Sequence, residues 1–331
     1  MTGVIIRNTG SWYDVRTDDG QVFACKVKGN FRLRGIRSTN PVAVGDRVEF
    51  QPLSNSSREG GVSLSADRKG AYALITEIHD RSNYIIRRAS NLSKQSHIIA
   101  ANVDLACLIV TIAHPETSTT FIDRFLASAE AYRVPVSIIF NKVDLYDADE
   151  LRYLEAIMSL YRLLGYSCHA VSAVTGEGVE ELLCELRGKT SLFSGNSGVG
   201  KSTLLNCLIP DACARTAELS AAHDQGQHTT TFSEMYDLPA LPTGEKGGGI
   251  IDTPGIRGFG TFDFEPEEVS HYFREIFQVG RDCRFGNCTH THEPGCAVLD
   301  ALQRHEIAES RYQSYLSMLS DKDEGKYRDR S

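Results

Sequence analysis

The chain has 331 residues, two to three times the length of an average domain, so we expect two or three hydrophobic cores. Its composition, 41% hydrophobic and 24% charged, is that of an ordinary globular protein. No apolar run approaches the roughly 18 residues of a membrane span, and the first residues lack the pattern of a signal peptide. We therefore expect neither a membrane protein nor a secreted one.

The charge of the chain is unevenly distributed. Residues 1–100 hold 15 Lys and Arg against 9 Asp and Glu, although the net charge of the whole chain is −8. A basic end on an acidic protein suggests contact with a polyanion there. The nine cysteines are an odd number, and three of them lie within 14 residues, which favours one metal cluster in a reduced cytoplasm over a disulfide framework.

Short segments of strand type, separated by turn residues, fill the first 90 residues. The expected strands are 3–7, 12–16, 22–27, 47–51 and 73–79. Five short strands in this length predict a small antiparallel barrel of the OB type. We assign residues 1–90 to this domain.

From about residue 98, strands alternate with amphipathic helices, which predicts a parallel sheet with helices on its faces. The expected strands are 105–112, 136–140, 167–171, 190–193 and 249–251, and the expected helices are 121–132, 150–164, 179–186 and 201–208. Two further helices, 265–277 and 298–319, are expected around the cysteine cluster. We place an α/β domain at residues 98–262 and a helical domain at 263–331.

A phosphate-binding loop is indicated by the segment that follows the strand at 190–193. Its sequence, Gly195-Asn196-Ser197-Gly198-Val199-Gly200-Lys201-Ser202, matches G-x-x-x-x-G-K-[ST] and leads into an expected helix. Glycines let the backbone N–H groups wrap around phosphate oxygens. Lys201 would reach the β- and γ-phosphates, and Ser202 would bind Mg²⁺, with Thr203 next to it.

A base-selecting segment precedes this loop in the chain. Asn141-Lys142-Val143-Asp144 directly follows an apolar strand, where open α/β sheets bind ligands. The Asp144 carboxylate can accept hydrogen bonds from N1–H and the 2-amino group of guanine, and adenine offers neither donor. Ser172 and Ala173, after the next strand, would supply a backbone N–H to guanine O6. Together these segments favour GTP over ATP.

Two further segments are expected to sense the γ-phosphate. Asp252 follows a short apolar strand and would hold Mg²⁺ through water, and the Gly255 N–H would contact the phosphate.

In the threonine run 229–231 we favour Thr230 as a Mg²⁺ ligand, with Thr229 next. Ile256 stands where Ras-like GTPases carry a water-orienting glutamine, so we expect the catalytic role to fall to His228.

The order of these segments is rotated relative to most GTPases, because the base selector comes before the phosphate loop. This order indicates a circular permutation of the same sheet. It places Gly255 only 28 residues before Cys283, so we expect the nucleotide state to act on the C-terminal domain.

A structural zinc site is predicted after residue 280. Three thiols and an imidazole, from Cys283, Cys288, His290 and Cys296, lie within 14 residues. Such a set closes a tetrahedral shell around Zn²⁺ and leaves no position for water. His292 is a possible substitute ligand.

The barrel also contains a basic segment at 26–47. It holds six basic residues and one acid, with an aromatic residue among them: Lys26, Lys28, Arg32, Arg34, Arg37, Arg47, Asp46 and Phe31. This combination on an OB-like barrel is typical of RNA binding.

The combined motifs resemble those of the ribosome small subunit-dependent GTPase A (RsgA) family. The matching segments are 44–47, 141–144, 195–202, 226–231, 252–255, 283–290 and 293–298. The resemblance implies a multidomain chain with an OB-fold β-barrel, a circularly permuted α/β P-loop GTPase domain and a helical zinc-binding domain. It also implies GTP/GDP, Mg²⁺ and one Zn²⁺ as ligands, a catalytic His228, and His290 in preference to His292.

The partner that the resemblance implies is the 30S ribosomal subunit with its 16S rRNA, which would stimulate GTP hydrolysis during late maturation. We further expect a cytoplasmic monomer that binds neither DNA nor membranes. Two alternatives are a kinase-like metabolic P-loop enzyme with a structural zinc module, and a zinc-finger RNA-binding protein with a vestigial nucleotide site.

Overall fold

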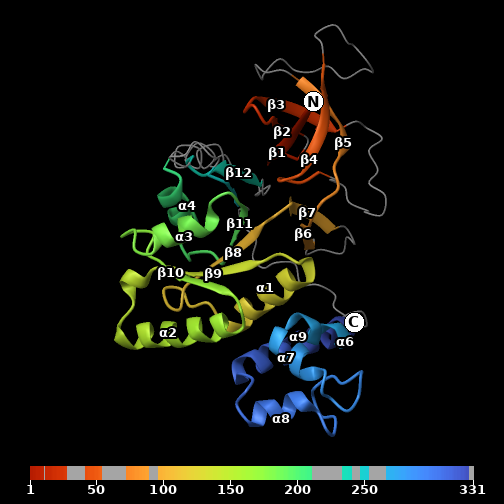
Figure 1. Cartoon of the computed structure of the whole chain (residues 1–331), viewed down its shortest axis with the longest axis vertical. Helices are drawn as coiled ribbons and strands as arrows, with labels where there is room; N and C mark the ends of the chain where they lie inside the picture. The colour runs from red at the N-terminus through yellow and green to blue at the C-terminus, as the bar shows by residue number, and fades with distance from the viewer. Residues whose placement is uncertain are drawn as a thin grey trace. The chain divides into compact units, whose positions relative to one another are not determined.

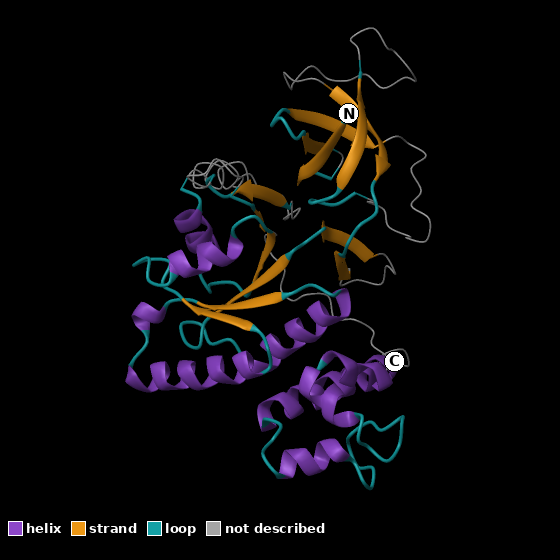
Figure 2. Ribbon diagram, in the orientation of Figure 1, coloured by secondary structure: helices purple, strands orange, loops and turns teal. Residues whose placement is uncertain are grey.

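The computed structural model describes residues 1–10, 12–27, 42–53, 72–88, 96–210, 233–240, 247–252 and 266–327. The chain divides into two compact units, one of residues 1–105, 183–193 and 205–255 and the other of residues 106–182, 194–204 and 256–331. Figure 1 labels the elements, and Figure 2 colours the helices purple and the strands orange. Among the described residues the helices begin with Thr119. Within the described ranges, no helix is both long and apolar enough to cross a bilayer.

The N-terminal barrel has five strands. They are β1 (Thr2–Asn8), β2 (Tyr13–Arg16), β3 (Val22–Val27), β4 (Arg47–Pro52) and β5 (Tyr72–Ile78). Their order is β1-β2-β3-β5-β4, and pairing of β1 with β4 closes the barrel. β3 and β5 run parallel, whereas the other pairs are antiparallel. The expectation of a small five-stranded barrel is confirmed.

The turn before β4 contains residues 44–47, one of the motifs that resemble the RsgA family, and its contacts explain two of these residues. Gly45 has φ +91°, and a Cβ there would lie 2.0 Å from the Ala101 carbonyl oxygen. The next carboxylate, on fully buried Asp46, accepts the Ala43 N–H and pairs with the Arg81 guanidinium at 2.6 Å. These contacts fasten the start of β4 to the strands that follow the barrel, so this segment has a structural role.

The same unit contains a hairpin and three short strands beyond the barrel. β6 (Tyr84–Arg88) and β7 (Ser96–Ala101) form an antiparallel pair. β11 (Thr190–Ser194) runs parallel to β13 (Gly249–Asp252), and β12 (Glu234–Asp237) pairs antiparallel with β13 and with β1. The strand expected at 249–251 is confirmed; the hairpin and β12 were not predicted.

The second unit contains a parallel sheet with strand order β10-β9-β8. β8 (Leu105–Val110), β9 (Val136–Phe140) and β10 (Ser167–Ala170) pair in parallel, as expected from the alternation of strands and helices. The connecting elements are α1 (Thr119–Tyr132), η1 (Val143–Leu145), α2 (Ala148–Leu163) and α3 (Val179–Leu186), and α4 (Lys201–Leu208) follows the phosphate loop. β8 and β9 are buried along their whole length, which explains their continuous apolar sequences.

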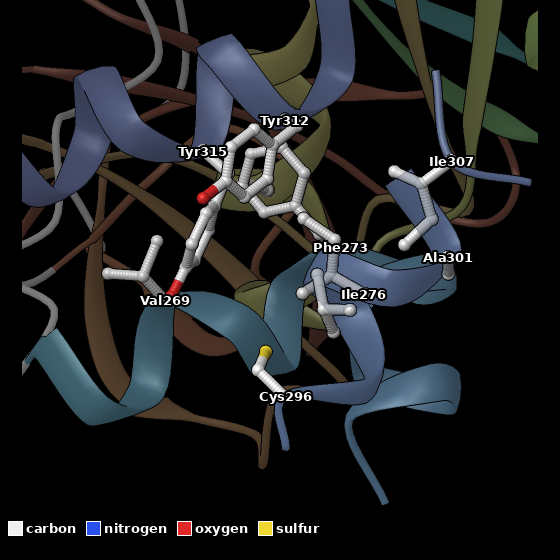
Figure 3. Packing of buried hydrophobic residues seen from close by; sticks show 10 residues of the cluster. Val269, Phe273, Ile276, Cys296, Ala301, Ile307, Tyr312 and Tyr315 are labelled. Carbon is white, nitrogen blue, oxygen red and sulfur yellow. The ribbon is translucent and has the colours of Figure 1, made fainter. Parts of the chain in front are cut away.

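The C-terminal helices form one core and pack on α1. They are α6 (Pro266–Val269), η2 (Ser270–Tyr272), α7 (Arg274–Gly280), α8 (Ala297–Gln303) and α9 (Glu309–Tyr327), and α9 lies against α1. Figure 3 shows Phe273 and Tyr315 packed among the aliphatic side chains of this core. Their rings meet edge to face, with centroids 5.7 Å apart.

Two expected helices in this region are interrupted. The helix expected over 265–277 is broken at Phe273, whose backbone is extended and whose ring is fully buried. The helix expected over 298–319 is divided into α8 and α9. α8 ends because His305 adopts φ +59° and the Glu306 N–H bonds back to the Ala301 carbonyl. This is a Schellman turn with histidine where glycine is usual, so the sequence pattern does not reveal it.

Candidate nucleotide site and metal centre

Asn141 connects three segments of the candidate nucleotide site. Its side chain is buried, its Nδ2 donates to the Val199 carbonyl at 2.9 Å, and its Oδ1 accepts the Ala173 N–H at 3.1 Å. Its own N–H bonds to the carbonyl of Val110, the last residue of β8. The predicted base selector, the phosphate loop and the segment after β10 therefore lie together at the carboxyl ends of neighbouring strands.

The glycines of the phosphate loop are required by its surroundings. A Cβ on Gly195 would lie 2.2 Å from the Ile109 carbonyl oxygen, and a Cβ on Gly200 would lie 2.4 Å from Asn141 Nδ2. Both residues have positive φ, as does Gly198. A side chain at Gly195 would thus displace the loop from β8, and one at Gly200 would displace it from Asn141 of the base selector.

Two lysines point their ammonium groups at backbone carbonyls of the site. Lys201 donates to the carbonyls of Gly195 and Asn196, both at 2.7 Å, so its side chain folds back over the phosphate loop. Lys142 donates to the carbonyl of His114. The phosphate loop therefore has a cation above it, where the sequence places the β- and γ-phosphates.

The remaining predicted contact residues of this unit lie around the same edge. Asp144 is exposed in η1, and Ser197, Ser202 and Thr203 are exposed at the phosphate loop and the start of α4. Ser172 is buried and its hydroxyl accepts the Thr175 N–H at 3.0 Å, which shapes the turn after β10. One of the Ser172 and Ala173 N–H groups was predicted to meet guanine O6. In the structure the Ala173 N–H bonds to Asn141 Oδ1, and the Ser172 N–H bonds to the Glu177 carbonyl at 3.0 Å.

The γ-phosphate sensors are described in part. Asp252 ends β13, and its strand partner is Phe193, two residues before Gly195. His228, Thr230 and Gly255 lie outside the described residues, as does Thr229, so their roles stay predictions.

A loop that the sequence analysis did not single out borders the site. It follows β8 from Thr111 onward, and it contains a cis peptide bond between His114 and Pro115. Pro115 faces Gly198, since a Cβ on that glycine would lie 3.5 Å from Pro115 Cδ. The position of this loop at the carboxyl end of a buried strand was the available signal, because ligands bind at such ends.

The four predicted metal ligands meet at one point. The ligand atoms of Cys283, Cys288, His290 and Cys296 all lie within 4.8 Å of one another. His290 Nδ1 is 3.5 Å from the sulfurs of both Cys283 and Cys296, and these two sulfurs are 3.9 Å apart. His292 is exposed and lies outside this cluster.

These separations fit a tetrahedral zinc ion. With Zn–S near 2.3 Å and Zn–N near 2.05 Å, a regular tetrahedron requires about 3.8 Å between sulfurs and about 3.6 Å between sulfur and nitrogen. A disulfide would instead bring the sulfurs to about 2.05 Å. Burial lowers the pKa of His290, so the imidazole is neutral and can use Nδ1 as a ligand.

The neighbours of His290 fix its orientation. Gly280 leaves room for the ring, since a Cβ there would lie 3.1 Å from Cε1. The His290 carbonyl accepts the Tyr312 hydroxyl at 2.7 Å, and the Thr289 carbonyl accepts the Tyr315 hydroxyl at the same distance. The ligand loop is therefore bonded to α9, and through that helix to α1.

Two of the six basic residues in the barrel segment 26–47 are described, Lys26 and Arg47. Lys26 lies over the Trp12 ring at 4.4 Å, and that ring lies 5.5 Å from the ring of Tyr72. Arg47 pairs with Asp18 at 2.8 Å. Lys28, Phe31, Arg32, Arg34 and Arg37 lie outside the described residues.

Comparisons with known proteins agree with this geometry. The model of the RsgA GTPase family matches residues 78–262, and that of the RsgA N-terminal domain matches residues 2–61. The small ribosomal subunit biogenesis GTPases RsgA of Bacteroides fragilis and Porphyromonas gingivalis are 62% and 57% identical to the chain over 328 residues, and each alignment covers 99% of both proteins.

Two solved structures have the same fold. YjeQ from Thermotoga maritima is 34% identical, with a TM-score of 0.71 and 97% of each chain covered. YloQ, described as a circularly permuted GTPase, is 28% identical with a TM-score of 0.69, covering 98% of this chain and 95% of its own. The rotated motif order, the shared fold and the full-length identity lead to one conclusion: this chain belongs to the RsgA family of GTPases.

Proposed function

We propose that this protein binds GTP with Mg²⁺, hydrolyses it, and acts in biogenesis of the small ribosomal subunit. The observation that carries the nucleotide part is the Asn141 side chain, which bonds both to the phosphate loop and to the segment after β10. The relatives named small ribosomal subunit biogenesis GTPase support the biological role. Family membership argues against the kinase-like alternative.

In the proposed reaction the base and the phosphates are held by different segments. Asp144 accepts from the guanine edge, and the N–H groups from Gly195 to Lys201 surround the phosphates. Lys201 exchanges the carbonyls of Gly195 and Asn196 for phosphate oxygens. Ser202 and Thr230 would hold Mg²⁺, and Asp252 would hold it through water; when bound, the ion would supply positive charge to the phosphates. His228 orients the attacking water, and Gly255 contacts the γ-phosphate.

We assign one structural Zn²⁺ to Cys283, Cys288, His290 and Cys296. The donor set and its spacing support zinc over a hard cation, because thiolates favour it. The ion would join the segment around Cys283 to the start of α8, and so hold the C-terminal domain in the form that packs on α1.

The barrel supplies an RNA-binding face in this proposal. Along β3 and β5 the residues next to Lys26 and Tyr72 point inward, because Cys25 and Ala73 are buried. Strand alternation therefore places Lys26 and Tyr72 on the outside of the barrel, together with Trp12. Aromatic rings beside a cation are suited to stacking RNA bases, and we name 16S rRNA as the partner.

The domain division 1–90, 98–262 and 263–331 is also our proposal, as is a cytoplasmic monomer that binds neither DNA nor membranes. In this arrangement the barrel and the C-terminal domain contact the ribosomal subunit, and the nucleotide state governs release.

Equilibrium titration with labelled GDP, competed by GTP and by ATP, tests the nucleotide assignment. GTP should compete at micromolar concentration and ATP should not. Equal competition by ATP would contradict selection of guanine and would favour the kinase-like alternative instead.

The RNA-binding face has its own test. Trp12→Ala and Lys26→Ala should weaken cosedimentation with purified 30S subunits and leave intrinsic GTP hydrolysis unchanged. Val22→Ala is the matched control, since Val22 is an exposed apolar residue of β3. Unaltered 30S binding in both barrel variants would remove this face from the proposal.

A further inference from the structure

Tyr146 joins the ends of two strands beneath the base selector. It follows η1, its side chain is buried, and its hydroxyl makes two hydrogen bonds. The hydroxyl donates to the Asn141 carbonyl at 2.6 Å and accepts the Ile112 N–H at 3.1 Å. One phenol thus bonds both to the first residue of the base selector and to the second residue of the loop after β8.

The Asn141 carbonyl lies next to a strained position. Lys142, directly after it, has φ +67°, a left-handed conformation that costs a residue with a side chain about 1 kcal/mol or more. The Val143 N–H bonds to the Val171 carbonyl at 3.2 Å, which holds the far side of the bend. The Tyr146 hydroxyl bonds to the Asn141 carbonyl, directly before Lys142, so a hydrogen bond lies on each side of the bend.

The second partner, Ile112, connects Tyr146 to the phosphate loop. The loop from Ile112 places His114 where its carbonyl accepts the Lys142 ammonium, and places Pro115 against Gly198. Loss of the Tyr146 hydroxyl would release this loop and the bend at Lys142 together. The bend at Lys142 lies two residues before Asp144, the predicted base-contacting residue.

We propose that Tyr146 is a positioning residue for guanine selection, holding the bend at Lys142 so that Asp144 meets N1–H and the 2-amino group of the base. This inference rests on the proposed function. Burial raises the pKa of Tyr146, so the hydroxyl remains a donor throughout the physiological range.

Tyr146→Phe is the direct test, because it removes both hydrogen bonds and keeps the ring. Fluorescently labelled GDP is bound to the full-length protein and competed by unlabelled GDP and by inosine diphosphate, which lacks the 2-amino group. We expect GDP affinity to fall about fivefold and the preference for GDP over inosine diphosphate to fall at least about threefold. Tyr153→Phe, on a half-exposed tyrosine of α2, is the matched control and should change neither value.

The preference for GDP over inosine diphosphate separates positioning from mere packing. Partial unfolding lowers both affinities by the same factor, so their ratio is independent of the folded fraction. An unchanged ratio in Tyr146→Phe would overturn the inference even if the melting temperature falls. Failure of the wild-type protein to bind labelled GDP would instead overturn the proposed function itself.

Discussion

Arg311 and Asp123 form a fully buried ion pair, with Nη1 of the arginine 2.7 Å from Oδ1 of the aspartate. The pair joins α9 to α1. The same guanidinium donates through Nε to Glu275 of α7 at 2.7 Å, and the Tyr161 hydroxyl donates to Asp123 at 2.8 Å. One arginine thus connects the C-terminal helices α7 and α9 to α1, the helix that follows the loop after β8.

Arg311→Ala should destabilise the protein severely. It leaves the buried carboxylate of Asp123 and the partly buried one of Glu275 without their cation, and breaking a buried pair from one side costs about 3 to 5 kcal/mol. Urea denaturation followed by circular dichroism measures the loss. Arg304→Ala is the control, because the Arg304–Glu306 pair is exposed and its removal should leave the midpoint unchanged. Equal urea midpoints for the two variants would show that the buried ion pairs do not stabilise the packing of the C-terminal helices on α1.

Gly200→Ala should abolish nucleotide binding without unfolding the chain. The added Cβ would lie 2.4 Å from Asn141 Nδ2 and would displace the side chain that joins the loop to the base selector. Gly176→Ala is matched in conformation, since Gly176 has a similar positive φ and open space around it. Labelled GDP should bind Gly176→Ala nearly as well as the wild type. Retention of binding by Gly200→Ala would contradict the role given to Asn141.

Zinc content should depend on the cluster and not on thiols in general. The purified protein is expected to hold one zinc ion per chain by elemental analysis, and Cys288→Ser should lower this sharply. Cys184 is an exposed thiol of α3 remote from the cluster in sequence, so Cys184→Ser should keep the ion. A zinc content that is the same in both variants would refute the ligand assignment.

Zinc retention should weaken as the pH falls. Burial raises the pKa of Cys288 to about 12 and also raises that of Cys296, so metal binding must displace protons from these thiols. Because lower pH favours the protonated thiols, the apparent affinity should drop by about tenfold or more per pH unit. Competition with a chromogenic chelator at pH 8, 7 and 6 measures it, with chelator affinity corrected for pH. A flat profile would argue against thiolate ligands.

Much of this fold follows from local sequence rules. The barrel strands, the buried strands β8 and β9 and the phosphate loop each carry a period or a motif that suffices by itself. α2 begins two residues earlier than expected, because Asp147 and Glu150 form a capping box around its first turn.

The parts that could not be predicted depend on tertiary contacts. Burial of Phe273 against Tyr315 interrupts a sequence that is otherwise favourable for a helix. β12 has four residues, two of them charged, and is a strand because β13 and β1 pair with it. Nothing in the local sequence distinguishes Tyr146. Its two hydrogen-bond partners follow β8 and β9, and they come together only because these two strands pair.

GTP hydrolysis with and without purified small ribosomal subunits tests the central claim most directly. Large subunits and His228→Ala protein serve as controls. We predict that 30S subunits raise turnover more than about tenfold, that large subunits do not, and that His228→Ala loses most of the stimulated rate. Turnover that is the same with and without 30S subunits would contradict the account.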